Sequence, residues 1–395
     1  MSEWKECTIG ELCKKICSGG TPNRNNDTFY LNGNIPWLNT KEVSFNRIYQ
    51  TENFITELGL KNSAAKWIPQ NTVVVAMYGA TAGKSAIVKI PVTTNQACCN
   101  LTIDGSKADY RFVYYSLFNR YEHLASLANG GAQQNLNAGL IREFKISVPE
   151  LETQTKIADI LSSLDDKIEL NNQINRNLEE QAKAIFKSWF IDFEPFGGEM
   201  PSDWTIGKLI ELCDFQEGYV NPAQTHNEFF DGNIKWLRAV DINESFIIET
   251  SRTLTTAGFE SAGKSALLFK PNTIAISKSG TIGRLGIVAD YMCGNRAVID
   301  IAPRSEINLS FIHQYLKLHQ SEFPDLAVGS VQKNLYISIL ENLDIIIPTE
   351  KTLYSFANIL DPIYKQMKCL CQEASNLKII RDSLLPKLMS GELSH

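Results

Sequence analysis

Residues 33–38 read GNIPWL and residues 232–237 read GNIKWL, an interval of 199 residues in a chain of 395. Further matches recur at this interval or one residue more: ELC at 11–13 and 211–213, Pro22 and Pro222, Asn95 and Asn295, Ala97 and Ala297, and LA at 127–128 and 326–327. A constant interval along a whole chain is typical of an internal repeat. The sequence therefore predicts two copies of one unit.

Each copy contains both strand and helix patterns. The apolar runs TVVVA at 72–76 and NTIAI at 272–276 are bounded by Pro, Gly and Asn, which is typical of buried strands. Residues 112–127 and 311–326 have a helical pattern. The predicted fold class is therefore mixed α/β (α+β), in two tandem homologous domains.

A long amphipathic helix is predicted after each domain, because apolar residues alternate at spacings of four and three. The helix-pairing seam comprises Ile157, Leu161, Leu164, Ile168, Asn171, Asn175, Leu178, Ile185 and Trp189 in the first helix, and Phe356, Leu360, Ile363, Met367, Leu370, Leu377, Leu384 and Leu388 in the second. One small domain cannot cover such a stripe, so we expect the two helices to pack on each other. The alternative is that each helix docks only on its own domain.

The predicted boundaries divide the chain into four regions. They are a first domain at 1–149, a first helical region at 150–195, a second domain at 196–348 and a second helical region at 349–395.

Composition excludes several classes of protein. The net charge is −6, so a face that binds nucleic acid must be a local concentration of Lys and Arg. No apolar run is long enough to span a bilayer, and the first residues, MSEWKECTIG, do not resemble an export signal. We expect a cytoplasmic protein whose nine cysteines are buried free thiols, with no metal site.

Motifs that suggest catalysis are incomplete. GATAGKS at 79–85 has three residues between its glycines, where a phosphate-binding loop needs four, and the corresponding residues 279–285 lack the Lys-Ser pair. DPIY at 361–364 lacks one proline of the Asp-Pro-Pro-Tyr loop of amino-group methyltransferases, and a proline that starts a helix explains it better. The five histidines do not recur between copies and form no catalytic triad. No catalytic residue is predicted.

Several stretches together resemble one known family. They are GGTP at 19–22, TNQA at 94–97, IADILSSLDDKIELNNQIN at 157–175, AIFKSWF at 184–190 and RDSLLPKLMSGEL at 381–393. The chain is similar over essentially its whole length to the specificity subunit of type I restriction-modification systems. The second domain departs from this pattern, with EGYVNP at 217–222 in place of the Gly-Gly-Thr-Pro turn.

The resemblance implies a DNA-binding, non-catalytic subunit with two target-recognition domains, each reading one half of a bipartite double-stranded DNA target. It implies that the two helices pair as an antiparallel coiled coil, whose length should set the spacer between half-sites. The implied partners are two modification subunits, which bind S-adenosylmethionine and methylate adenine, and restriction subunits. No cofactor is expected in this chain. Because the two domains differ in sequence, the target should be asymmetric.

Loops that recur in both copies are the best candidates for DNA contact, because Arg, Lys, Asn and Gln read base edges and bind phosphates. The candidates are Thr21, Arg24, Lys41, Lys84, Gln133, Gln134 and Asn135 in the first copy, and Arg238, Lys278, Arg284, Gln332, Lys333 and Asn334 in the second. Residues identical in both copies, such as Trp37 and Asn95, are expected to be framework. The Gln-x-Asn-Leu loops could equally stabilise turns.

Two other functions stay open. One is an enzyme, either a nucleotide hydrolase or a self-contained adenine methyltransferase, and the other is a coiled-coil adaptor that binds no DNA. Acidic residues also gather in the first helical region: Asp159, Asp165, Asp166, Glu169, Glu179 and Glu180. We expect either a solvated helix face or, as a hypothesis, a surface that helps to hold the modification subunits.

Overall fold

The computed structural model describes residues 4–128, 135–329 and 333–393. The chain forms two compact units, of which the first comprises Met1–Asp166 and Lys378–His395 and the second comprises Lys167–Leu377. The boundary between the units falls inside both long helices. The helical regions expected at 150–195 and 349–395 therefore each contribute residues to both units.

The two units contain the same strands and helices in the same order, except that a 3₁₀ turn (Leu209–Glu211) in the second unit takes the place of the first helix of the first unit. The first unit has β1 (Lys5–Thr8), α1 (Ile9–Leu12), β2 (Cys13–Ser18), β3 (Ile35–Leu38), β4 (Asn46–Ile48), β5 (Phe54–Ile55), α2 (Glu57–Lys61), β6 (Trp67–Ile68), β7 (Val73–Ala76), β8 (Ser85–Val88), β9 (Val92–Thr94), β10 (Cys98–Ile103), α3 (Tyr110–Asn119), α4 (Tyr121–Ser126), α5 (Ala138–Glu143) and β11 (Lys145–Val148). The second has β12 (Thr205–Lys208), β13 (Cys213–Glu217), β14 (Phe230–Leu237), β15 (Phe246–Ile247), β16 (Thr253–Leu254), α7 (Thr256–Glu260), β17 (Leu268–Phe269), β18 (Ile274–Ser277), β19 (Leu285–Val288), β20 (Met292–Gly294), β21 (Val298–Pro303), α8 (Leu309–Leu318), α9 (Phe323–Leu326), α10 (Ile337–Glu341) and β22 (Asp344–Ile347).

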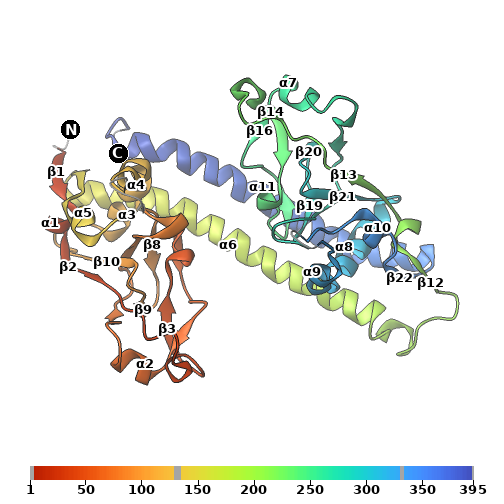
Figure 1. Ribbon diagram of the computed structural model, residues 1–395, viewed down its shortest axis with the longest axis horizontal. Helices are drawn as coiled ribbons and strands as arrows, with labels where there is room; N and C mark the ends of the chain where they lie inside the picture. Colours follow the sequence, from red (N-terminus) through yellow and green to blue (C-terminus); the bar gives the residue numbers. More distant parts are fainter. Residues whose placement is uncertain (1–3, 129–134, 330–332, 394–395) are drawn as a thin grey trace. The chain divides into compact units, whose positions relative to one another are not determined.

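Sheet topology repeats as well. The five-stranded sheets have the orders β2-β10-β7-β8-β4 and β13-β21-β18-β19-β15, and the four-stranded sheets have the orders β5-β3-β9-β6 and β16-β14-β20-β17. In the first unit α2 and β3 lie at the end away from the long helix α6 (Leu151–Phe190), and α7 lies away from α6 in the second (Figure 1). The predicted mixed α/β fold in two tandem copies is confirmed.

The central strands are buried on both faces, which explains their continuous apolar sequence. In β7, Val73 and Val75 pack in the cluster that includes α3, whereas Val74 and Ala76 pack in a second cluster on the opposite face. This alternation follows from the two-residue period of a strand.

The helical pattern at 112–127 corresponds to two helices, α3 and α4, with a break at Arg120 (φ −105°, ψ 21°). The guanidinium of Arg120 donates a hydrogen bond to the carbonyl of Lys145 (2.6 Å). Residues 311–326 are likewise divided, into α8, a short 3₁₀ turn and α9. The apolar periodicity continues through both breaks, so the sequence pattern did not reveal them.

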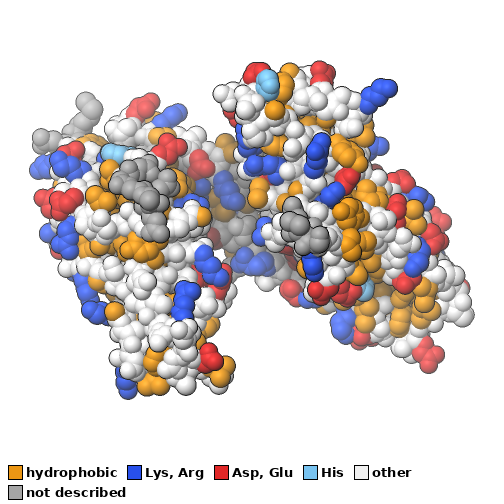
Figure 2. Space-filling view, in the orientation of Figure 1, with side chains coloured by type: hydrophobic (Ala, Val, Ile, Leu, Met, Phe, Trp, Pro, Cys, Tyr) orange, Lys and Arg blue, Asp and Glu red, His pale blue; other side chains and the backbone are white. Residues whose placement is uncertain are grey.

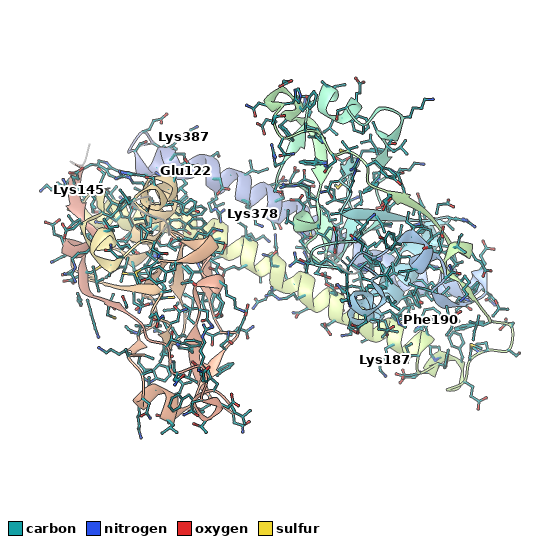
Figure 3. The ribbon with its side chains drawn as sticks, viewed as in Figure 1. Glu122, Lys145, Lys187, Phe190, Lys378 and Lys387 are labelled. Carbon is teal, nitrogen blue, oxygen red and sulfur yellow. The ribbon has the colours of Figure 1, made fainter. Side chains whose placement is uncertain are left out.

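The two long helices, α6 (Leu151–Phe190) and α11 (Glu350–Met389), contain 40 residues each. In the first unit the last turns of α11 contact α6, and Arg381 pairs with Asp165 (2.6 Å). In the second unit Phe190, in the last turn of α6 (Figure 3), packs on Phe356 near the start of α11, with ring centroids 4.8 Å apart. Asn171 donates a hydrogen bond to Glu373 (2.7 Å) in the same unit, so the partners of α6 move back along α11 as α6 proceeds, and the two helices run antiparallel there.

The predicted seam residues are buried or partly buried throughout. Many of them also contact a domain. Ile157, Leu161 and Leu388 belong to the core cluster of the first domain, and Phe356 and Leu360 belong to that of the second. Pairing of the helices and docking on the domains thus occur together, where the sequence analysis treated them as alternatives.

The interpretation of Pro362 as a helix start is wrong, because it lies inside α11. Its ring removes one backbone N–H, which leaves the carbonyl of Asn358 without its usual partner. Both residues are exposed, so water can bind this carbonyl and the helix continues.

All nine cysteines are free thiols, but only Cys98, Cys99, Cys213 and Cys293 are buried, and Cys369 is exposed. Among the described residues, neither the long helices nor any other helix is apolar enough along its length to cross a membrane.

Candidate nucleic-acid interface

Four segments of the first unit meet at one end of the five-stranded sheet: the β7–β8 hairpin loop, the turn before β10, the segment after β3 and the residues around Leu136. Four hydrogen bonds join them: Met77 N–H to Ala97 O (2.8 Å), Leu136 N–H to Met77 O (2.9 Å), Asn95 N–H to Leu38 O (3.0 Å) and Thr81 Oγ1–H to Thr40 O (2.8 Å). Loops far apart in sequence thus form one continuous surface.

The second unit repeats this arrangement. The corresponding bonds are Lys278 N–H to Ala297 O (2.8 Å), Leu335 N–H to Lys278 O (2.9 Å) and Asn295 N–H to Leu237 O (2.9 Å). We call these surfaces the first and second loop faces. Six of the predicted DNA-contact residues lie in these segments: Lys41, Lys84 and Asn135 in the first, and Arg238, Lys278 and Arg284 in the second. Lys333 and Asn334 directly precede Leu335.

The glycine-rich stretch at 79–85 is a hairpin loop, because it is followed by strand β8 and not by a helix. Phosphate-binding loops precede a helix whose N-terminus faces the phosphate. Gly83 has φ +84°, and an added Cβ would lie 3.2 Å from Cβ of Ala125 on α4. Gly283 has φ +86°, and an added Cβ there would lie 3.0 Å from Cβ of Phe323 on α9. These glycines are explained by the turn and by helix packing, as the sequence analysis expected of a tight turn between two strands.

Lys84 and Lys41 provide the positive charge on the first loop face. The Lys84 ammonium lies 3.3 Å from the Ser44 hydroxyl and 5.9 Å from the Phe45 ring centroid. Lys41 is exposed and pairs with Glu52 at 2.5 Å. The charge of Lys41 is therefore balanced, whereas no described carboxylate pairs with Lys84.

The second loop face has more cations, two of which are paired. Arg238 lies 3.6 Å from a carboxylate oxygen of Asp241, and Lys278 pairs with Glu217. Burial lowers the pKa of the Lys278 ammonium, which also lies 5.6 Å from the ring centroid of Tyr336. Arg284, like Lys84, has no ion pair within the described residues, and Lys333 is exposed.

Of the remaining candidates, Gln133, Gln134 and Gln332 lie outside the described residues. Thr21 is half-buried and Arg24 is exposed. The segment that carries Arg24 leads to Tyr30, whose ring packs on Trp37 in the four-stranded sheet. Asn334 forms a backbone bridge with Val328. DNA contact stays a prediction for every candidate residue, including those on the two loop faces.

Figure 2 shows Lys and Arg interspersed with Asp and Glu on the visible face of each unit. Positive charge therefore does not form one broad patch on this face, consistent with the overall net charge of −6.

Sequence reasoning missed Gln96 and Arg296, which are exposed at the centre of the turn on each loop face. The matching Asn and Ala on either side were noted as repeat positions, whereas Gln96 was quoted only as part of the TNQA stretch and Arg296 was not considered. The sequence signal that could have revealed them is a position that differs between the two copies while the residues on both sides of it are identical.

Four carboxylates of the acidic helical region attach α6 to residues of their own unit. The pairs are Asp159–Arg111 (2.6 Å), Asp165–Arg381 (2.6 Å), Asp166–Arg47 and Glu179–Lys317 (2.8 Å). The expected solvated face is therefore wrong for Asp165 and Glu179, whose side chains are only 10% and 22% exposed. Asp159 and Asp166 are paired but remain solvated, with side chains 61% and 67% exposed.

His313 is a core residue of the second unit. Its Nδ1 lies 2.7 Å from the Tyr364 hydroxyl, and burial lowers the pKa of its imidazole to about 3.

Within residues 4–128, 135–329 and 333–393, no three His, Cys, Asp or Glu side chains are placed to hold a metal ion.

Comparisons with known proteins give one consistent family. A family model described as the type I restriction modification DNA specificity domain matches residues 1–180 and again 201–377. The chain is 30% identical to the type I restriction enzyme MjaIX specificity subunit of Methanocaldococcus jannaschii, with 99% of this chain and 96% of that protein aligned. It is 24% identical to the type I restriction enzyme HindI specificity subunit of Haemophilus influenzae over the full length of both.

A solved structure has the same fold. The S subunit of a type I restriction-modification system from M. genitalium matches with a TM-score of 0.59 and 18% identity, over 98% of this chain and 96% of that one.

Proposed function

The chain belongs to the type I restriction modification DNA specificity family, and on this premise we propose that each of its domains reads one half of an asymmetric, bipartite DNA target. The observation that carries the proposal is the repeated loop face. Both domains hold the same four segments with matching backbone hydrogen bonds, and both place basic or amide side chains on them.

The side chains on the two loop faces differ, although the backbone frame is shared. Lys41 corresponds to Val240, and Asn39 corresponds to Arg238. A shared frame with unequal side chains suits two readers of unequal sequences, because base identity is read by side chains at the groove edges.

The partners are two modification subunits, with S-adenosylmethionine bound there and not in this chain, together with restriction subunits. The proposed role of this chain is non-catalytic. The hairpin geometry of residues 79–85 supports this role over nucleotide hydrolysis, since the loop lacks the following helix.

The test is methylome sequencing of cells that express this chain with its modification subunits. We expect methylated adenines in a split motif with two different halves. Lys84→Ala and Arg284→Ala should each reduce methylation of the whole motif, because loss of a phosphate contact weakens binding to every sequence. Lys145→Ala, on β11 (Figure 3), is the matched control and should leave methylation unchanged.

A contiguous or palindromic motif would contradict the proposal. So would binding of S-adenosylmethionine or hydrolysis of ATP by the purified chain alone, measured by calorimetry and phosphate release. If the complex binds no duplex selectively, the adaptor function is favoured.

A further inference from the structure

The first unit holds a guanidinium between α3 and α6. Arg111, in the first turn of α3, donates hydrogen bonds to Asp159 (2.6 Å) and to the Ser162 hydroxyl (3.4 Å), which both lie on α6. The same guanidinium pairs with Asp109 (2.7 Å) at the start of α3. One arginine of the chain therefore supplies donors to acceptors on both helices.

In the second unit α8 lies on α11 in the same register as α3 lies on α6. The Tyr115 hydroxyl donates to Asp165 (2.5 Å), and 199 residues later the Gln314 amide donates to the Tyr364 hydroxyl (3.0 Å). Because a helix presents the same face every three to four residues, the positions one or two turns before these pairs also correspond. Position 310 of α8 therefore faces positions 358 and 361 of α11.

The residue at position 310 is a serine, so the second unit lacks the guanidinium. Ser310 and Asn308 correspond to Arg111 and Asp109, and they are only 2% and 7% exposed. Neither the Ser310 hydroxyl oxygen nor the Asn308 side-chain oxygen has a hydrogen-bond partner within the described ranges of the chain. A buried polar atom without a partner is unfavourable, which points to a group that binds here from outside.

The proline inside α11 adds an acceptor at the same place. Pro362 has no N–H, so the carbonyl of Asn358 lacks its helical partner, whereas the corresponding residue of the first unit, Ser163, has an N–H. Asn358 and Asp361 are exposed. The α11 side of this region is therefore accessible to a partner.

Two carboxylates make the surroundings negative. Burial raises the pKa of the Asp361 carboxyl and the nearby Glu306 carboxylate raises it further, whereas the Lys365 ammonium lowers it. Lys365 forms no ion pair with Asp361 in the part of the chain that the structure describes. The residues that lack a donor are called the acceptor cluster: Glu306, Asn308, Ser310, Asn358 and Asp361. Such a cluster repels phosphate and favours a cation that carries several N–H donors.

We infer that the acceptor cluster binds an arginine side chain of a protein partner, where the first unit uses its own Arg111. A guanidinium has five N–H donors in one rigid plane and no acceptor, so it can bind acceptors on two helices at once. Under the proposed function, on which this inference rests, the partner is a modification subunit. Because Arg111 already fills the first unit, only one of the two modification subunits makes this contact.

The experiment titrates the full chain with its modification subunits and resolves complexes with one and with two of them by native mass spectrometry. Ser310→Arg copies the first domain and supplies the guanidinium from within the chain. It should weaken the binding of one modification subunit by about tenfold or more and leave the other unchanged, so complexes with one subunit accumulate. The unfolding midpoint of the free variant should stay the same or rise, because buried acceptors gain donors.

Asp361→Ser is the second variant, since it copies Ser162 at an exposed position that should tolerate the change. It should weaken the same binding step without lowering the unfolding midpoint. Ser265→Arg is the matched control. Ser265 is exposed and follows α7, which lies away from α6 (Figure 1), so this variant should leave both binding steps unchanged.

The identity of the bound group is tested with phenylglyoxal, which modifies arginine side chains. One arginine of the modification subunit should be protected in the complex with the wild-type chain and labelled in the complex with Ser310→Arg. Protection that is the same in both complexes would show that no arginine of the partner occupies the acceptor cluster.

The outcomes separate this inference from the proposed function. If Asp361→Ser leaves both binding steps unchanged, or if the variants weaken both steps equally, the acceptor cluster does not bind one modification subunit and the inference is wrong, while the proposed function stands. A loss of binding by Ser310→Arg that comes with a lower unfolding midpoint would reflect misfolding and would also count against it. If the wild-type chain binds no modification subunit, the proposed function fails and the inference fails with it.

Discussion

The first domain meets the long helices through buried charges, whereas the second uses neutral groups at the corresponding positions. In the first unit the Tyr115 hydroxyl donates to Asp165 (2.5 Å), which also pairs with Arg381 (2.6 Å). The residues 199 positions after Tyr115 and Asp165 are Gln314 and Tyr364, and the Gln314 amide donates to the Tyr364 hydroxyl (3.0 Å). The same contact between domain and long helix is thus charged in the first unit and a neutral hydrogen bond in the second.

A second exchange occurs beside it, at a residue with left-handed backbone in both copies. Phe45 (φ +55°) stacks on Phe118 with centroids 4.2 Å apart. Its counterpart Glu244 (φ +67°) accepts hydrogen bonds from Lys317 (3.0 Å), which corresponds to Phe118, and from Gln320 (2.8 Å).

These exchanges show that contacting residues changed together while the backbone frame stayed the same. A lysine in place of Phe118 would lose the ring stacking with Phe45, and a tyrosine in place of Asp165 would remove the carboxylate that Tyr115 and Arg381 contact. Each domain is therefore matched to its own segments of α6 and α11, and the differences can be tested by substitution.

The largest expected effect comes from breaking the charged junction. Asp165→Leu should destabilise the first unit by about 3–5 kcal/mol, because Arg381 is only 12% exposed and would keep a buried charge without its main partner. The double variant with Arg381→Leu should recover a large part of this loss. Denaturant unfolding, with hydrogen exchange to localise the effect to the first unit, measures both.

The exposed pair Glu6–Lys145, at 2.7 Å, is the control, and Glu6→Ala should leave the free energy of unfolding nearly unchanged because water screens this pair. Equal effects of Glu6→Ala and Asp165→Leu would show that burial of the junction is unimportant.

The second prediction concerns a buried strand position that is Asn100 in one copy and Asp300 in the other. Burial raises the pKa of the Asp300 carboxyl to about 7, while the hydrogen bond from Thr273 (2.5 Å) acts in the opposite direction. Because the pKa is higher in the folded than in the unfolded state, protonation stabilises the fold at low pH, and this stability is lost as pH rises from about 4 to about 7.

Between pH 5 and pH 8 we therefore expect the second unit to lose roughly 3 kcal/mol through Asp300, at about 1.4 kcal/mol per pKa unit. Asp300→Asn, which copies the first domain, should remove this part of the pH dependence. Urea unfolding of both proteins across this pH range is the measurement, and parallel curves would refute the assignment.

The smallest expected effects distinguish the aromatic contact from the ionic one. Phe45→Ala should cost about 2 kcal/mol at any salt concentration, because it removes packed apolar surface. Glu244→Ala should cost about 1 kcal/mol or less, since Lys317 keeps its pair with Glu179 (2.8 Å), and the cost should shrink in 1 M salt. The two substitutions share the same left-handed backbone, so each controls for the other. A salt-dependent cost at Phe45 would contradict this difference.

The tandem fold could be predicted from sequence because its signals are local or strictly periodic. The interval of 199 to 200 residues revealed the repeat, and runs such as TVVVA at 72–76 revealed the buried strands. Ion pairs between distant residues have no such signal. Arg381 was an interruption of the apolar seam and Asp165 a member of an acidic face, and only the fold brings the two together.

The loop faces were predicted only in part. Leu136 and Leu335, the last residues of the two Gln-x-Asn-Leu stretches, donate hydrogen bonds to Met77 and Lys278, which directly follow the central strands of the recurring hairpins. Lys278 pairs with Glu217, which is 61 positions away in the chain. The sequence therefore did not reveal that the Lys278 side chain is held by an ion pair. Arg238 and Asp241 are only three positions apart, and that pair could have been foreseen.

The interleaving of the helices has a consequence for the order in which the protein folds during synthesis. Leu385 and Leu388 complete the hydrophobic core of the first unit, although nearly all of that unit precedes them in the chain. A nascent polypeptide must therefore keep an unfinished core until residues 378–389 have been translated, whereas the second unit has all its residues once Leu377 has been made. The first unit is therefore synthesised first but completed last. A chain released before residues 378–389 are translated would have a first unit without part of its core, and proteases could cleave it.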